Sequence, residues 1–344
     1  MPDNKVAARP LQTPTSLPPE MAVRPERVGQ TPPPLPSSTR AGDSFAQAPA
    51  QAPVALNSSR AEKLPPQRAI WGEQGLSADE ARQRALDARK VKLPGSGEVH
   101  LRNVQSTPAQ LERLKATIEA AKPSYNPEES GYNKYGMYVA AEQMLKTDFS
   151  GPQFEGMTAY DLMELVWFTD FGYEGVNAAL WSRDPAKLAE AEDGIVRVSA
   201  AANRFPAHEG LVLRSDYYLG NGVRGNEQKA LGEARGRAEQ LRNDGFFVTK
   251  AFWSTTKAQT DEMKSRVTEG LDSTLHYEIV SKTGRDLHGV NPGRAEEEVL
   301  FLPGTLFRVV DVQEKQVPKE GPGSNPLGVQ IKVLLEEVPV DARA

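Results

Sequence analysis

The C-terminal part of this sequence contains strand segments that follow one another without a helix between them. Apolar and polar residues alternate in "TLHYEIVS" (274–281), and the apolar segments 298–302, 305–312 and 328–338 come next, after short connections or loops. Parallel neighbours need a long crossover, usually a helix, whereas antiparallel neighbours need only a turn. The segments therefore predict antiparallel pairing and argue against βαβ crossovers.

Helical segments dominate the sequence before residue 205. Residues 77–90 begin with the capping box of Ser77 and Glu80, and 107–122 begins with Thr107 as N-cap. We expect further helices over 158–169, from Asp184 onward, and over 226–242, with strands over 209–218 and 246–256. The order of these elements predicts one α+β domain with a helical N-terminal part and a strand-rich C-terminal part.

Residues 1–70 differ in composition from the rest of the chain. They hold 14 of the 27 prolines and one aromatic residue, Phe45, within Pro-, Ala-, Ser- and Gln-rich segments. Such a composition buries too little apolar surface to offset the entropy of ordering, so we expect disorder. The segment is either a linker or a secretion leader that stays unfolded for export, and composition does not decide between them.

Composition excludes several classes of function. The net charge is −5 and the pI about 5.6, which argues against a nucleic-acid partner. The chain has no Cys, so it has no disulfide, no thiolate nucleophile and no Cys-based metal site. Its four histidines lie far apart, and we expect no metal site. We also expect no membrane span, since no apolar run is long enough, and no cleavable signal peptide.

The glycines of "GNGVRG" match a dinucleotide-binding pattern at Gly220, Gly222 and Gly225. The preceding strand, however, ends in the polar "RSDYY", and the next ends at Ser254 with no acidic residue for a ribose. The later succession of strands also disfavours a doubly wound sheet. We therefore favour a Gly-rich surface loop over a Rossmann crossover.

Three carboxylates precede an apolar segment in "RAEEEVLFLPGTLFRVV" (294–310), which turns at Pro303-Gly304 and is typical of a buried β-hairpin. A run of charge usually lies on a solvated loop. On a strand, however, Glu296 and Glu298 would share one face and Glu297 would take the other. Paired carboxylates at a strand edge suit chemistry at a sugar carbon, where positive charge develops.

Two other strands carry polar residues of interest. Arg214 follows Leu213 in the middle of a predicted strand, where a charge is costly without an anion. Its guanidinium suits a carboxylate or a phosphate, and an internal salt bridge is as plausible as a ligand contact. Ser254, Thr255 and Thr256 end another strand, where hydroxyls often serve only to make a turn.

Taken in order, these segments resemble the arginine–serine–glutamate class of mono-ADP-ribosyltransferases, the cholera-toxin-like, arginine-specific enzymes. The family pattern is an Arg on one strand, an aromatic residue followed by hydroxyl residues on a second, and Glu-x-Glu entering a third. Here these are "LVLRSDYY", "FWSTT" and "EEEVLFL". "YEGVNAALW", with Tyr173, Asn177 and Leu180, is similar to an upstream helical motif of the family, and the resemblance spans residues 130–313.

The resemblance implies a fold, a domain division and a substrate. The fold is ADP-ribosyltransferase-like, with N-terminal helices followed by two packed, mostly antiparallel sheets that form an NAD cleft. The catalytic domain is then 126–344, after a disordered leader at 1–70 and a helical accessory segment at 71–125. That accessory segment is either a site for a secretion chaperone or part of the catalytic domain. NAD is the substrate, and no metal is needed.

The resemblance also implies roles for site residues. Arg214 would hold the NAD pyrophosphate, and Ser254 would brace Glu298 and the nicotinamide-side ribose. Glu298 would bind the ribose 2′-hydroxyl and stabilise the developing cation, while Glu296 would engage the acceptor. Residues 284–295 would recognise the acceptor. The implied catalytic residues are Arg214, Ser254, Glu296 and Glu298, and the implied NAD-binding residues are Arg214, Ser254, Thr255, Thr256 and Glu298.

The function implied is transfer of ADP-ribose from NAD to arginine side chains of host proteins, with release of nicotinamide. A catalytically inactive NAD-fold binding module and an NAD glycohydrolase are the alternatives. The leader and the absence of Cys also resemble bacterial type III secreted effectors, virulence factors delivered into the host cytosol. The alternative location is the bacterial cytoplasm.

Overall fold

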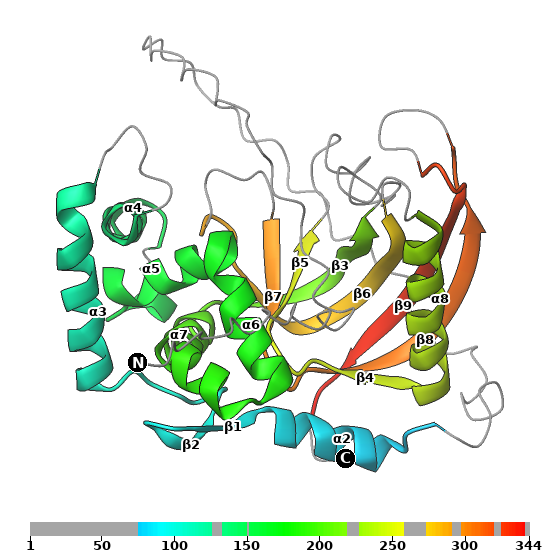
Figure 1. Ribbon diagram of the computed structural model, residues 1–344, viewed down its shortest axis with the longest axis horizontal. Helices are drawn as coiled ribbons and strands as arrows, with labels where there is room; N and C mark the ends of the chain where they lie inside the picture. The colour runs from blue at the N-terminus through cyan, green and yellow to red at the C-terminus, as the bar shows by residue number, and fades with distance from the viewer. Residues whose placement is uncertain are drawn as a thin grey trace, which may run out of the picture.

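The computed structural model describes residues 75–125, 133–149, 151–218, 227–257, 273–290, 297–319 and 325–340. Figure 1 shows a group of helices on one side of the strands and α8 on the other, with α2 along the lower edge. The α-helices are α2 (Ala78–Ala88), α3 (Pro108–Ala121), α4 (Lys134–Thr147), α5 (Ala159–Trp167), α6 (Tyr173–Ser182), α7 (Pro185–Ala202) and α8 (Glu227–Asp244). The strands are β1 (Lys90–Leu93), β2 (Gly97–His100), β3 (Ala207–Tyr218), β4 (Phe246–Val248), β5 (Trp253–Lys257), β6 (Ser273–Asp286), β7 (Glu297–Phe301), β8 (Leu306–Gln316) and β9 (Val329–Val338).

Strands β3 to β9 are joined by hydrogen bonds in the order β3-β5-β7-β6-β9-β8-β4. β3 also pairs with β6, so β3, β5, β7 and β6 close a ring. The β6–β9 pair is parallel and the other pairs are antiparallel. The predicted α+β fold with mostly antiparallel strands is confirmed. β3 pairs antiparallel with β5 and β6, which follow α8 in the sequence. A Rossmann crossover would need parallel strands here, so the structure agrees with the prediction against one.

The sheet is strongly curved, so that it forms two packed layers. β5 and β8 are four steps apart in the strand order, which in a flat sheet is about 19 Å. Yet the rings of Trp253 on β5 and Phe307 on β8 have centroids 5.5 Å apart, and Trp253 also contacts Tyr277 of β6 at 5.2 Å. The expected two sheets are therefore two layers of one hydrogen-bonded sheet, with β5 and β7 facing the others across an aromatic core.

The predicted hairpin around Pro303-Gly304 is wrong. The chain does turn there, with Gly304 at φ +77°, but β7 pairs with β5 and β6, whereas β8 pairs with β4 and β9. Phe301 and Phe307 instead meet edge to face, with centroids 4.9 Å apart. The two strands thus lie in opposite layers, because their large aromatic residues fill the space between the layers.

Residues 246–256, expected as one strand, form two. β4 pairs with β8 and β5 pairs with β7, and the chain changes layer between them. The Thr249 hydroxyl holds this change of direction by donating to the carbonyl of Leu302 at 3.0 Å. A continuous apolar pattern does not reveal such a break, because both halves are buried.

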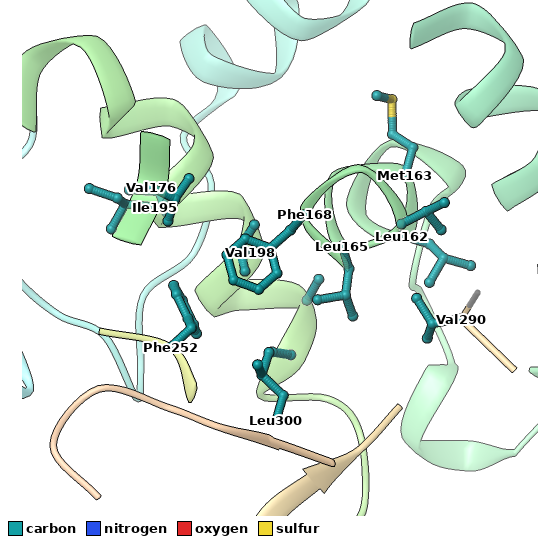
Figure 2. Close-up of a cluster of buried hydrophobic side chains, with 14 of the residues drawn as sticks. Leu162, Met163, Leu165, Phe168, Val176, Ile195, Val198, Phe252, Val290 and Leu300 are labelled. Atoms are coloured by element: carbon teal, nitrogen blue, oxygen red, sulfur yellow. The ribbon is translucent and has the colours of Figure 1, made fainter. Parts of the chain in front are cut away.

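The helices α4 to α7 pack around an apolar core that reaches the outer face of the β5–β7 layer (Figure 2). α5 contributes buried residues all round, and a π-helical turn at Phe168–Gly172 links it to α6. Phe168 meets Phe252, which precedes β5, at 5.1 Å between ring centroids. Leu300 of β7 belongs to the same cluster, so one face of the β5–β7 layer is covered by helices.

The segment 71–125 is not wholly helical where the structure describes it. β1 and β2 form an antiparallel hairpin. "KVKL" alternates in burial, and Gly97, at φ +73°, begins β2 directly after the turn. α2 packs against β4 and β8 through Ala81 and Ala85. A Cβ on Gly304 would lie 2.5 Å from the Ala85 carbonyl oxygen, so this turn tolerates only glycine under α2.

A buried histidine lies in the centre of the strands. His276 of β6 is fully buried, and its Nδ1 lies 3.0 Å from the hydroxyl of Ser215 on β3. Burial, with help from the charge of Lys332, lowers the pKa of His276 from 6.5 to about 4. Between about pH 4 and pH 6.5, this imidazole is therefore neutral in the folded protein and protonated in the unfolded chain.

We expect the free energy of unfolding to fall as the pH drops from about 6.5 to about 4, because only the unfolded chain takes up this proton. Between pH 7 and pH 5 the loss from His276 is about 2 kcal/mol. Urea unfolding at both pH values measures it in the wild type and in His276→Asn, which lacks the titrating group. An equal change in the two proteins would contradict this assignment.

Candidate active site

The β5–β7 pair brings the serine and glutamate motifs together. Thr256 lies opposite Glu298 and Ser254 opposite Leu300. Residues directly opposite on antiparallel strands point to the same face, so Ser254 and Glu298 share the face that Leu300 presents to the helices. They are diagonal neighbours on that face, about 7–8 Å apart. The structure thus places two of the predicted site residues on one surface.

Thr255 points to the other face of this pair. Its side chain is buried, and its hydroxyl donates to the carbonyl of Val299 on β7 at 2.7 Å. Val299 belongs to the core between the two layers, as Trp253 does at its edge. Thr255 therefore fastens β5 to β7, while Ser254 and Thr256 occupy the face of Glu298.

Arg214 reaches the same strand from β3. Within the described residues, the pairing of β3 with β5 consists of Leu213 opposite Thr256. Beside it the Arg214 Nη1 donates to the carbonyl of Ser254 at 2.7 Å, and the guanidinium lies over the Trp253 ring at 5.5 Å. Arg214 and Ser254, 40 residues apart in sequence, are thus in direct contact.

The anion beside Arg214 is Asp216. Its Oδ1 accepts from Nε at 3.0 Å and lies 2.9 Å from Nη2, and its side chain is buried. The internal salt bridge left open by the sequence is therefore present. In the described part of the chain these contacts and the Ser254 carbonyl engage three of the five N–H groups, so two N–H groups of Arg214 remain for a ligand.

The helical motif also reaches the site. The Asn177 side chain on α6 accepts from the backbone N–H of Phe252 at 3.1 Å. Tyr173 and Leu180 of the same helix lie in the helical core, Leu180 fully buried. Asn177 thereby fixes the residue two positions before Ser254, which gives this sequence motif a structural role.

Of the acidic triplet, Glu297 and Glu298 are described and Glu296 lies outside the described residues. Glu297 is opposite Lys257, and its Oε2 lies 3.1 Å from the Lys257 Nζ. Since neighbours on a strand point to opposite faces, Glu298 points away from this ion pair, as the sequence predicted. The glycine loop at 220–225 and residues 291–295 of the expected acceptor loop also lie outside the described residues.

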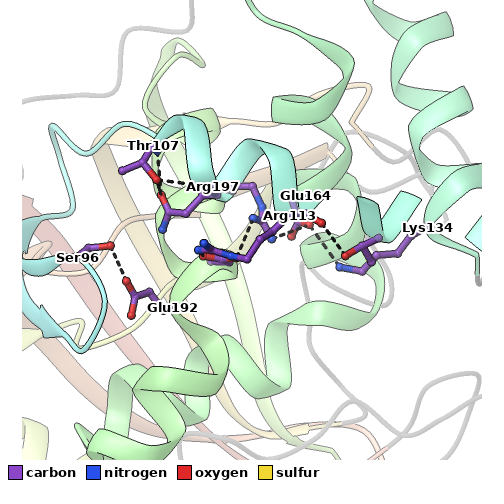
Figure 3. A network of polar contacts seen from close by, with 10 residues as sticks. Ser96, Thr107, Arg113, Lys134, Glu164, Glu192 and Arg197 are labelled. Carbon is purple, nitrogen blue, oxygen red and sulfur yellow. Dashed lines mark hydrogen bonds and ion pairs between the residues drawn. The ribbon is translucent and has the colours of Figure 1, made fainter. Parts of the chain in front are cut away.

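A hollow lies between α5, α6 and α7, with a volume of about 440 Å³. The charged residues that line it are paired. The buried Glu164 contacts the buried Arg197 at 3.2 Å and Lys134 at 3.4 Å, and Asp193 accepts two hydrogen bonds from the exposed Arg113 on α3 (Figure 3). This network joins α3, α4, α5 and α7. It holds the helical part together, and we assign the candidate site to the strands.

No group of three or more His, Asp or Glu residues suited to a metal occurs in the described ranges. Among the described helices, none is long and apolar enough to cross a membrane. The sequence analysis did not identify Asp216 and Lys257 as neighbours of the site, whereas Trp253 is the aromatic residue of its "FWSTT" motif. Asp216 lies two positions after Arg214 on a strand, so the two side chains share a face. This spacing could have identified Asp216 as the partner of Arg214.

No protein-family model matches the chain. Over 150 residues it is 27% identical to a protein of Mycobacterium avium (strain 104) provisionally named NAD(+)--arginine ADP-ribosyltransferase Mav. The match covers 44% of this chain and 16% of that protein. The chain therefore spans a small part of the length of this curated relative. The name of this similar protein is that of an arginine-specific ADP-ribosyltransferase, the family that the sequence motifs resemble. This agreement confirms the resemblance.

Solved structures of low identity are also similar. The type III effector XopAI of Xanthomonas axonopodis pv. citri is 17% identical, with a TM-score of 0.45 over 79% of this chain and 98% of that chain. The ADP-ribosyltransferase HopU1 of Pseudomonas syringae is 16% identical, with a TM-score of 0.40 over 77% and 100%. The Vis toxin of Vibrio splendidus is 16% identical, with a TM-score of 0.38 over 70% and 89%. At these values the activity of this chain remains a proposal.

We expect Thr255→Val to lower the free energy of unfolding by about 1 kcal/mol, because it removes a buried hydrogen bond between β5 and β7. Thr256→Val is the matched control, since its hydroxyl makes only a 3.3 Å contact with the adjacent Lys257 carbonyl. Urea unfolding of both variants measures the difference. Equal losses would show that Thr255 does not fasten the two strands.

Proposed function

We propose that this protein transfers ADP-ribose from NAD to arginine side chains of other proteins and releases nicotinamide. The observation that carries the proposal is the register of β5. Its Ser254 carbonyl binds Arg214 of β3, and its Thr256 lies opposite Glu298 of β7. A guanidinium, a hydroxyl and a carboxylate from distant parts of the sequence are thereby grouped on adjacent strands.

Arg214 supplies the positive charge of the site. Asp216 and the Ser254 carbonyl hold its guanidinium in place, and the Trp253 ring lies beneath it. A guanidinium with two N–H groups still available suits the oxygens of a pyrophosphate. The role of Arg214 in this proposal is to bind and orient NAD rather than to take part in bond breaking.

Glu298 supplies the charge that the reaction needs. NAD brings a nicotinamide whose ring nitrogen is already cationic, so this group leaves as a neutral molecule and needs no acid to protonate it. Glu298 then stabilises the positive charge that develops on the ribose, an electrostatic role suited to a fixed carboxylate. Ser254, on the same face of the β5–β7 pair, braces Glu298 and the ribose.

Glu296 is assigned to the acceptor. Residues two positions apart on a strand share a face, and the proposal takes Glu296 and Glu298 to be such a pair. A protonated guanidinium, with a pKa above about 12, is a poor nucleophile. Glu296 orients it and accepts its proton as the nitrogen attacks. Arginine as the acceptor is also supported by the name of the M. avium relative, which matches part of this chain.

The proposal is tested with labelled NAD and a cell lysate that contains protein acceptors. We expect Glu298→Gln to reduce both labelling and NAD hydrolysis at least about a hundredfold, since it removes the charge opposite the ribose. Glu296→Gln should suppress labelling but leave NAD hydrolysis. Because both changes are nearly isosteric, thermal unfolding serves as the control for folding.

Undiminished labelling by Glu298→Gln would refute the site assignment. Equal loss of both activities in Glu296→Gln would refute the division of roles. A wild type that hydrolyses NAD without labelling any protein would instead be a glycohydrolase. One that gives no heat with NAD in calorimetry would be a binding module for another ligand.

We also propose that the protein is a bacterial effector that acts on host proteins in the host cytosol. The composition of residues 1–70, with 14 prolines and one aromatic residue, supports a secretion leader, and these residues lie outside the part of the chain that the structure describes. We expect the protein in the medium of cells with a working type III secretion apparatus and not in that of secretion-deficient cells. Immunoblotting of both fractions checks this, and equal amounts in the two media would contradict it.

A further inference from the structure

Lys257 lies at the centre of a charged cluster behind the candidate site. Its Nζ lies 3.0 Å from both carboxylate oxygens of Asp286 and 3.1 Å from Glu297 Oε2. The three side chains are 13%, 24% and 19% exposed, respectively, so solvent screens them only in part. Burial lowers the pKa of Lys257, but the hydrogen bonds to the two carboxylates outweigh this and raise it. The ammonium therefore stays charged at neutral pH.

The cluster joins the ends of three strands. Lys257 is the last residue of β5, Asp286 the last of β6 and Glu297 the first of β7. The segment between β6 and β7 is thus held at both of its ends by one ammonium group. Asp286 also accepts from the N–H of His288 at 3.2 Å, so the start of that segment is folded back onto the cluster.

The same cluster borders Glu298. The Glu298 carbonyl accepts from the N–H of Leu287 at 2.8 Å. Leu287 follows Asp286 and Glu298 follows Glu297, so this hydrogen bond lies directly beside the cluster. Since adjacent side chains on a strand point to opposite faces, an ion pair that fixes Glu297 on one face sets the direction of Glu298 on the other. Glu297, the middle carboxylate of the triplet, therefore has a structural role.

We propose that Lys257 is a positioning residue, which acts through Glu297 and Asp286 to aim Glu298 and to anchor the segment between β6 and β7. The inference rests on the proposed function, because it takes Glu298 as the residue beside the ribose. Without the ammonium, two partly buried carboxylates repel each other, and the first residue of β7 loses its partner on β5. Lys257 itself contacts neither NAD nor the acceptor.

The test compares Lys257→Met, Lys257→Arg and Lys332→Met. Lys332→Met is the matched control, because Lys332 forms an ion pair with Glu278 at 3.2 Å between β9 and β6, and neither residue has a role in NAD or acceptor binding in this proposal. We expect Lys257→Met to lower the rate of transfer to an arginine acceptor at least about thirtyfold and NAD hydrolysis by less, with a raised KM for the acceptor. Lys257→Arg should restore most of the transfer rate, and Lys332→Met should match the wild type.

Amide hydrogen exchange gives a readout that does not depend on activity. We expect Lys257→Met to lose protection at Leu287 and at the start of β7, while β8 and β9 keep theirs. If the wild type proved inactive, the proposed function would fail, and exchange would still decide whether Lys257 anchors this segment. Wild-type exchange at these amides would overturn the proposal. So would a transfer rate that Lys257→Met leaves unchanged or that Lys257→Arg fails to restore. Should Lys257→Met not fold, Glu297→Gln tests the same ion pair.

Discussion

The packing of Trp253 against Phe307 is the constraint on which the architecture depends. These rings belong to strands that are distant in the hydrogen-bonding order, and their contact requires the sheet to curve until its layers meet. Among the described residues, β3 and β5 pair at one position, Leu213 with Thr256. It is beside this position that Arg214 crosses to the Ser254 carbonyl, so the aromatic core between the layers and the candidate site have the same origin.

Local patterns were sufficient to predict most of the elements. The caps at Thr107 and Asp184 begin α3 and α7 as expected, because side-chain capping is decided within one turn of chain. Partner choice was not predictable in this way. The supposed hairpin at Pro303-Gly304 and the supposed single strand over 246–256 both failed, since the layer to which a buried strand belongs depends on side chains far away in sequence.

The candidate site shows the same division. Arg214, Ser254 and Glu298 were predicted from the order of the motif segments, and the two-residue period of a strand predicted that Glu297 and Glu298 point to opposite faces. The partners that hold them were not found. Lys257 meets Glu297 only because β5 and β7 pair in one register, and a shift by one residue would turn Lys257 to the other face.

The contact between α2 and the turn after β7 links two regions that are 215 residues apart, as the hydrogen bond from the Arg89 Nε to the Gly304 carbonyl shows. The C-terminal end of the helix covers the glycine so closely that a Cβ at position 304 would clash with the Arg89 Cγ and lie 2.5 Å from the Ala85 carbonyl oxygen. Evolutionary change at this turn is therefore coupled to change in α2. Exchange of the strand-rich half between related proteins would succeed only if the first helix were transferred with it.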